Sequence, residues 1–422
     1  MSDYSIPGAR PAKYRIMRAS LVAAALIAFA ISSASAQTFE DLEARLADHP
    51  SVAALRHEAE AREELAVAAR GLPDPTVSFG VNNVPLSDPG FDRIMMTNKA
   101  VGVRQEIPGF GVRSARSARE KGEAAAARLV ADWRLRRLRA ELIAMLARKQ
   151  AITERLELAR EQREAFDEFD ALIRAEIEAG RPVYFRLSEV EIERADVDRS
   201  IATLEGELGR IDAALIDLVD KAVDTPPPRQ EFLPWHGKAM DLYPAALAAA
   251  GIAVAKAGVA ESKAEFKPDL AFQYSYQQRE EGAEIPGVSS FSGEDWFSAG
   301  VTFSVPLWAP KSQSPRLRAA RARESAAEAD FHAAARAAAE EWRGHHAVHL
   351  AAVRNIELLE EKLRSADALI AAETRNYESG RSDYIRVLDA RIARLTLLSD
   401  LAAERANLAH HIAQANSLLV TP

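Results

Sequence analysis

Apolar residues recur along much of the chain at intervals of three or four positions, which places them on one side of an α-helix. In the first long stretch they are Leu135, Leu138, Leu142, Met145, Ile152 and Leu156, and in the return stretch Leu204, Leu208, Ile211, Leu215 and Leu218. A seam this narrow is typical of coiled coils. If wholly helical, the chain between Gly109 and Gly180 would span about 105 Å. The pattern therefore predicts very long, paired antiparallel helices.

Four shorter stretches alternate apolar and polar residues, which is the pattern of β-strands with two different faces. They lie at about 75–83, 98–107, 269–278 and 296–307. Each is close to the ~9–11 residues of a tilted membrane-crossing strand. Trp296 and Trp308 bracket the fourth stretch as an interfacial aromatic girdle would,. This favours a membrane sheet over an ordinary antiparallel sheet with one wet face.

Four strands cannot close a barrel, and an open edge in lipid leaves backbone groups without hydrogen-bond partners. The barrel must then be shared between chains. Two copies would give eight strands and a filled interior, whereas three would give twelve strands and room for a lumen. We therefore expect an α+β membrane protein in which a long antiparallel α-helical coiled-coil barrel joins a shared twelve-stranded transmembrane β-barrel in a trimer.

The two halves of the chain carry the same signals in the same order, on either side of a proline run at 226–228 that cannot continue a helix,. Gly180-Arg181 in the first half, for example, matches Gly380-Arg381 in the second, and a tyrosine follows each pair at the same spacing. This order predicts an internal duplication. We expect a first repeat at 37–224 with a hairpin tip near 180, a proline-rich linker at 225–236, and a second repeat at 237–422 with a tip near 380.

Residues 1–36 have the features of an export signal peptide. Met17-Arg18 precedes an apolar run at 21–31, and Ala34-Ser35-Ala36 is a cleavage site of the A-x-A kind,. The run is short for a membrane span, and a buried N-terminal helix is the alternative. Cleavage would make Gln37 the mature start, and either Met1 or Met17 could be the translated start.

Composition excludes several kinds of chemistry. The chain has no cysteine, so disulfides, thiolate metal sites and thiol catalysis are impossible,. Its formal net charge of −8 disfavours a nucleic-acid partner,. We find no nucleophile elbow, no phosphate-binding glycine loop and no convincing carboxylate pair. We therefore expect neither an enzyme nor a cofactor, and any transport energy must come from a partner.

The strand pairs between helices, the duplication and the paired Gly-Arg turns together resemble the TolC family of outer-membrane factors, over about residues 37–422. The resemblance implies a homotrimeric efflux channel in outer-membrane lipid, with helices extending into the periplasm. It also implies two partners, a periplasmic adaptor and an inner-membrane pump. Residues 105–111 are similar to members that serve heavy-metal pumps of the RND type, which implies heavy-metal cations as the solute.

Three other functions remain open. The channel could instead serve drug efflux or type I protein secretion, because all solutes share one lumen and the pump selects them. From a different class, a periplasmic coiled-coil scaffold would account for the helices and the export signal. It would not account for four alternating strands bracketed by tryptophans.

The resemblance assigns a docking role to the two helix reversals. Gly180, Arg181, Gly380 and Arg381 match the periplasmic tip at which adaptors bind. Glycine at such a reversal commonly takes a left-handed backbone conformation. The glycines could also serve only to cap the helices, and both roles are compatible.

The resemblance also assigns residues to the entrance at this tip. Tyr377 matches a position whose polar links hold the entrance closed, and Asp389 matches an acidic ring. Arg386, with its first-half counterpart Arg186, stands where a second acidic ring residue is expected. We therefore expect either a less cation-selective entrance or different gating ion pairs. A solvated coiled-coil face is the alternative explanation of these charges.

Histidines provide the one metal-binding pattern. His345 and His349 are four residues apart on a predicted helix and could share a metal ion,. The HExxH motif is absent, and we favour a solvated or adaptor-facing cluster. His410 and His411 are adjacent and so point to different faces of a helix.

Overall fold

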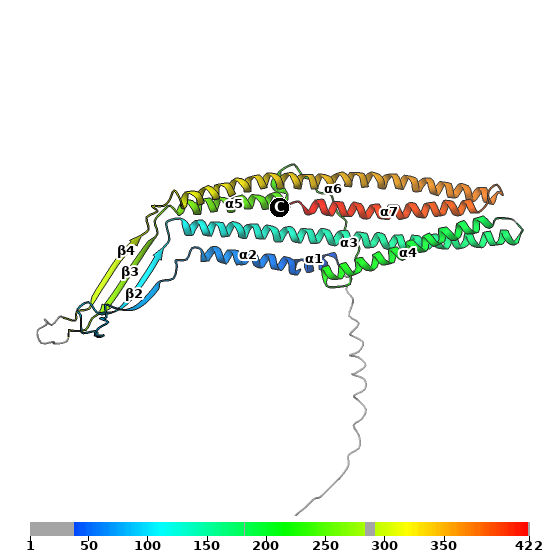
Figure 1. The fold of residues 1–422 in the computed structure, drawn as a ribbon. Coiled ribbons are helices and arrows are strands. Elements are labelled where there is room, and N and C mark those ends of the chain that lie inside the picture. The colour runs from blue at the N-terminus through cyan, green and yellow to red at the C-terminus, as the bar shows by residue number, and fades with distance from the viewer. Residues whose placement is uncertain (1–37, 181, 283–291, 421–422) are drawn as a thin grey trace, which may run out of the picture.

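The computed structural model describes residues 38–180, 182–282 and 292–420. They form one elongated body in which helices run side by side, and four strands extend from one end as a narrow arm (Figure 1). The export signal predicted at 1–36 and the tip residue Arg181 lie outside the described residues.

Two pairs of long antiparallel helices form most of the body, as the apolar seams predict. α3 (Val112–Glu178) has 67 residues and α6 (Gln313–Glu378) has 66, which corresponds to about 100 Å each. α4 (Tyr184–Val219) returns along α3, and α7 (Ile385–Ser417) returns along α6. Because α7 also packs along α3, the lateral order is α4, α3, α7, α6.

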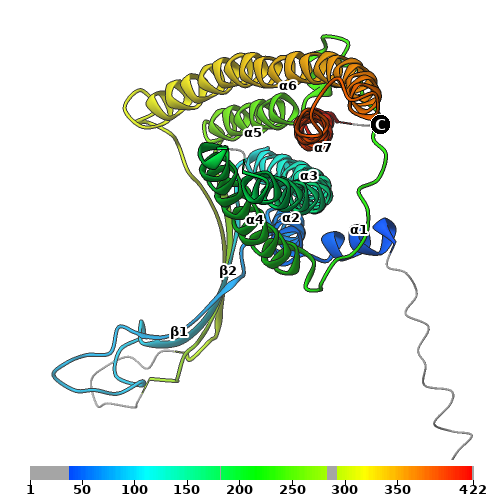
Figure 2. The same cartoon turned by 90° about the vertical axis from the view of Figure 1, so that its right-hand side faces the viewer.

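Two shorter helices flank the long ones at the end next to the strands. α2 (Pro50–Ala68) packs on α3, and α5 (Tyr243–Ala264) packs on α3 and α6. By length and composition alone α5 is apolar enough to cross a membrane, but it lies alongside the long helices in both views (Figures 1 and 2). Its many alanines let neighbouring helices approach closely.

The largest apolar core lies where α1 (Phe39–Ala47), α3 and α4 meet. Leu42 and Leu46 of α1 are fully buried there against Leu142 of α3 and Leu215 of α4. These α3 and α4 residues belong to the predicted seams, so the seam is the core of the coiled coil. Replacing such a leucine with alanine typically costs about 2–5 kcal/mol, which makes the seam a principal source of stability.

A belt of short segments covers one face of the helices. It consists of α1, residues 220–242 with the 3₁₀ helix η1 (Ala239–Asp241), and residues 418–420. The N–H of Val420 donates to the carbonyl of Asp241 at 2.8 Å. On α3 the belt lies over Ile143 and over Arg139, whose guanidinium pairs with Glu43 at 2.8 Å. The predicted linker at 225–236 lies within the belt and contains neither helix nor strand.

The strands form one antiparallel sheet in chain order, with β1 at Thr76–Asn82, β2 at Asn98–Ile107, β3 at Leu270–Gln278 and β4 at Trp296–Phe303. The central pair, β2 and β3, joins the two halves of the chain. β4 ends at Phe303 rather than at residue 307 because its partner there, Leu270, is the first residue of β3.

Both outer edges of this sheet are open. Within the described residues β1 pairs only with β2, and β4 only with β3. Each edge therefore presents unpaired backbone groups, which a membrane does not tolerate. The four-stranded antiparallel sheet is thus confirmed, whereas the trimer and its shared twelve-stranded barrel stay predictions.

Candidate functional site

One face of the sheet is a continuous apolar surface. The strand register places Phe79, Val101, Tyr276 and Phe297 in one row, and Val77, Val103, Tyr274 and Ala299 in the next. Phe79 is 80% exposed and Phe297 is 71% exposed. An apolar face that crosses all four strands is unfavourable in water. It has the character of the lipid-facing side of a membrane barrel.

The opposite face is polar, and small residues predominate in its central rows. One row across the four strands holds Ser78, Gly102, Ser275 and Ser298, and the next holds Thr76, Arg104, Gln273 and Gly300. Small side chains leave space in front of the sheet, and their polarity suits contact with water. This face has the character of a barrel lumen.

Trp296 differs from the role that its sequence position suggested. It alternates with Phe297 and therefore shares the polar face with Ser298,. The guanidinium of Arg279 lies 3.9 Å from the centroid of its ring. Trp308 and Phe110, near the helical end of the sheet, are 72% and 75% exposed and are better placed to form an aromatic girdle,.

The two helix reversals depend on glycine for backbone geometry. Gly180 has φ +84° and Gly380 has φ +70°, both left-handed. A Cβ atom added at either position would meet nothing within 4 Å, so the requirement is conformational and not one of space. The N–H of Gly380 donates to the carbonyl of Tyr377 at 2.9 Å, and the exposed Arg381 follows directly.

The predicted entrance residues lie close together at this tip. The rings of Tyr377 and Tyr384 lie 5.1 Å apart across the reversal. Burial raises the pKa of the Asp389 carboxyl above its ordinary value, and the positive charges of Arg186 and Arg386 act in the opposite direction. Arg186 belongs to the first hairpin, and Leu388 beside Asp389 packs with Ile173 and Val190 of that hairpin, so the structure brings the two hairpins together.

The histidines pair differently from the predicted spacing. His345 on α6 lies against His411 on α7, with 2.9 Å between their Nδ1 atoms. His349 instead stacks on Phe232 of the belt at 4.5 Å. In the parts of the chain that the structure describes, no three His, Cys, Asp or Glu side chains are grouped closely enough to hold a metal ion.

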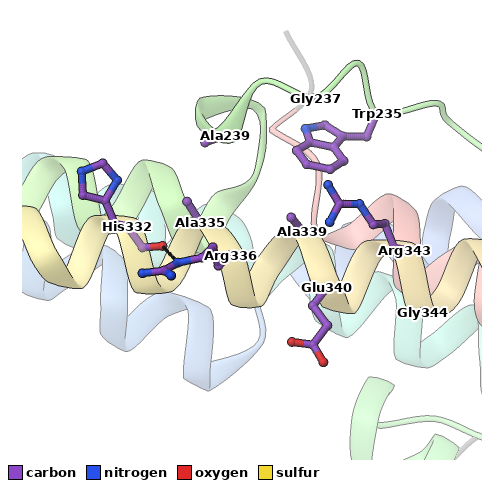
Figure 3. A pocket seen from close by; sticks show the side chains of 10 residues that line it. All are labelled: Trp235, Gly237, Ala239, His332, Ala335, Arg336, Ala339, Glu340, Arg343 and Gly344. Atoms are coloured by element: carbon purple, nitrogen blue, oxygen red, sulfur yellow. Dashed lines mark hydrogen bonds between the residues drawn. The ribbon is translucent and has the colours of Figure 1, made fainter.

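Two grooves lie on opposite sides of the helices. The first, of about 860 Å³, separates α6 from the belt, and Arg343 lies over Trp235 at its edge (Figure 3). The second, of about 740 Å³, lies on α3 between α4 and α7. It contains five arginines and two glutamates: Arg134, Arg137, Arg148, Arg155, Arg210, Glu141 and Glu207. This groove was not predicted from the sequence, although residues 134, 141, 148 and 155 recur every seven positions and are all charged.

Comparison with known proteins agrees with this architecture. The model of the outer membrane efflux protein family matches residues 42–219 and 246–418, one segment in each half of the chain. No curated protein matches the chain.

Solved structures of similar fold include an outer membrane protein, an outer membrane channel and a protein that forms a transmembrane channel. VceC from Vibrio cholerae is 16% identical, with 90% of this chain and 95% of that chain covered and a TM-score of 0.71. The open state of MtrE from Neisseria gonorrhoeae is 16% identical, with coverage of 89% and 87% and a TM-score of 0.73. CusC is 15% identical, with coverage of 90% and 91% and a TM-score of 0.72. At these identities the likeness establishes the fold. Together with the family match, it shows that the chain belongs to the outer membrane efflux protein family, whose members are outer-membrane channels with helical periplasmic tunnels.

Proposed function

We propose that this chain is the exit duct of a tripartite efflux system, a homotrimer that conducts solutes passively through one shared lumen. The observation that carries the proposal is the junction of two surfaces in one chain. An exposed apolar sheet with two open edges continues directly into helices about 100 Å long,. The sheet suits the outer membrane, and the helices suit a tunnel through the periplasm.

The partners of this duct are a periplasmic adaptor and an inner-membrane pump of the RND type. Gly180 and Gly380 shape the tips to which the adaptor would bind, and Arg181 and Arg381 provide charge beside them. The pump supplies the energy for transport, and the duct contributes no catalytic step.

Opening occurs at the same tip in this proposal. The positive charges of Arg186 and Arg386 act on the Asp389 carboxyl, and the tilted rings of Tyr377 and Tyr384 lie against each other across the reversal of the second hairpin. Movement of either hairpin on adaptor contact would separate these groups. This attraction between arginine and aspartate takes the place of part of the ring of acidic residues that the resemblance to the TolC family implies at the entrance.

Transport of heavy-metal cations remains a prediction, made from the sequence of residues 105–111. The same duct could serve drug efflux or protein secretion. Growth of a deletion strain on zinc, on copper and on a cationic dye separates these functions. Sensitivity to the metals alone supports heavy-metal cargo, and sensitivity to the dye alone contradicts it.

Membrane fractionation of the full-length chain tests the duct against the periplasmic scaffold. We expect the protein in the outer-membrane fraction, migrating as a trimer on unheated gels and as a monomer after boiling. N-terminal sequencing should give Gln37 as the first residue. A soluble monomer in the periplasm would contradict the proposal, because the apolar face of the sheet would then have no lipid to cover it.

A further inference from the structure

The wall of the helical body has two distinct faces at the level of the belt. α3 lies between α4 and α7 in this wall, so its other two sides belong to the two faces of the wall. The belt covers the side of α3 that carries Ile143. Glu141 and Arg148 point to the opposite side, because successive residues of an α-helix are rotated by about 100°. The arginine-rich groove is therefore on the face that the belt leaves open.

In the proposed duct this open face lines the lumen. The belt adds more than twenty residues of irregular chain and a helix to one side of each subunit. Three copies of it inside the tunnel would obstruct the passage, whereas outside they form a collar. With the belt outside, the groove faces the axis of the tunnel. Threefold symmetry then places three copies of the groove at the same height along that axis.

Most of the positive charge in the groove is not neutralised. Arg148 pairs with Glu207 at 3.4 Å. Arg155, by contrast, donates to the hydroxyl of Ser399 at 3.2 Å, and Arg134 donates to that of Ser51 at 3.1 Å. Hydroxyl partners leave the charge of a guanidinium intact. Five arginines against two glutamates give a local excess of positive charge on a chain whose net charge is −8.

A histidine beside the groove does not add to its positive charge. His410 of α7 is one of its lining residues. Burial lowers the pKa of this imidazole, and the positive charge of Arg148 lowers that pKa further. His410 is therefore neutral at pH 7 and does not add to the charge that the arginines supply.

We propose that this groove attracts anions in the lumen, so that the duct favours solutes carrying carboxylate, phosphate or sulfonate groups over free cations. The inference rests on the proposed function, because it needs the groove to face the passage. Guanidinium groups bind such oxyanions through paired hydrogen bonds as well as through charge. The inference stands against the heavy-metal cations predicted from residues 105–111.

Equilibrium binding of a trisulfonated pyrene dye to the detergent-solubilised full chain tests this inference. We expect salt-sensitive binding to the natural sequence. The triple variant Arg148→Gln, Arg155→Gln, Arg210→Gln should bind the dye about tenfold more weakly. Exchanging the same residues for lysine should retain most of the binding. If the glutamine triple variant assembles poorly, Arg210→Gln alone, at an exposed side chain of α4, tests the same claim.

The matched control removes three positive charges from the belt. Arg45, Arg229 and Lys238 are exposed there, and their replacement by glutamine should leave dye binding unchanged. The inference is overturned if the groove variants bind the dye like the natural sequence, or if the belt variant loses as much affinity. Light scattering on the same samples separates the two proposals. A monomer contradicts the duct, whereas a trimer that does not bind the dye contradicts only the anion groove.

Discussion

His345 on α6 and His411 on α7 form a direct contact, with their Nδ1 atoms 2.9 Å apart. At this distance one imidazole donates its N–H and the other accepts, which requires the accepting ring to be uncharged. Burial lowers the pKa of both rings below the ordinary value, and the neighbouring His410 acts in the same direction. The contact is therefore lost, and replaced by repulsion between two positive charges, when both histidines are protonated.

Lowering the pH should loosen this hairpin. The unfolded chain binds protons to these histidines more readily than the folded chain, so stability is present above the unfolded pKa and is lost as the pH falls below about 6.5. We expect a lower melting temperature at pH 5 than at pH 7.5. The double variant His345→Gln, His411→Gln should show a shallower dependence. A pH dependence as steep as that of the natural sequence would assign the effect to other groups.

Gly380→Val should disable the tip without preventing assembly. A β-branched residue is strained at φ +70°, at a cost of roughly 1–2 kcal/mol,. Because no side chain packs against this position, the strain should stay local. We expect normal trimer in the outer membrane and loss of export in a drug- or metal-sensitivity assay. Gly344→Val, within the regular helix α6, is the control and should export normally. Unaltered export by Gly380→Val would count against a role for the tip.

Neighbouring residues of β4 should respond oppositely to a charge. Phe297 lies in the apolar rows and Ser298 in the polar rows. Phe297→Arg places a charge in lipid, which costs about 2–4 kcal/mol near the bilayer midplane, and should reduce the amount of protein in the outer membrane. Ser298→Arg should insert at a near-normal level. Equal insertion of both variants would mean that the apolar face does not contact lipid.

Local periodicity accounts for the part of the fold that could be predicted from the sequence. The seam through Leu142 and Leu215 and the four alternating strands depend on spacing within one element, and the structure confirms both. The left-handed tip glycines follow from the same kind of local signal. The face of Trp296 was also readable, because strict alternation with Phe297 assigns it to the polar side.

Features that depend on packing between helices were not predictable in this way. Arg155 and Arg210 approach the same groove from α3 and α4, and the contact of His345 with His411 depends on the relative rotation of α6 and α7. Sequence spacing within one helix suggested a partnership of His345 with His349 instead. Which side chains meet across two helices depends on which face of each helix its apolar seam directs toward the other helix.

The most direct test of the central claim is disulfide trapping between the two open edges of the sheet. The natural chain has no cysteine, so a cysteine at Ser78 of β1 can be combined in turn with one at Ser298, Gly300 or Thr302 of β4. Within one chain β2 and β3 separate these positions, which puts them beyond the ~7 Å limit for a disulfide,. In a shared barrel β1 of one subunit lies beside β4 of the next. We predict covalent dimers and trimers on reducing-agent-free gels for at least one pair, and monomers alone from every pair would contradict the trimeric duct.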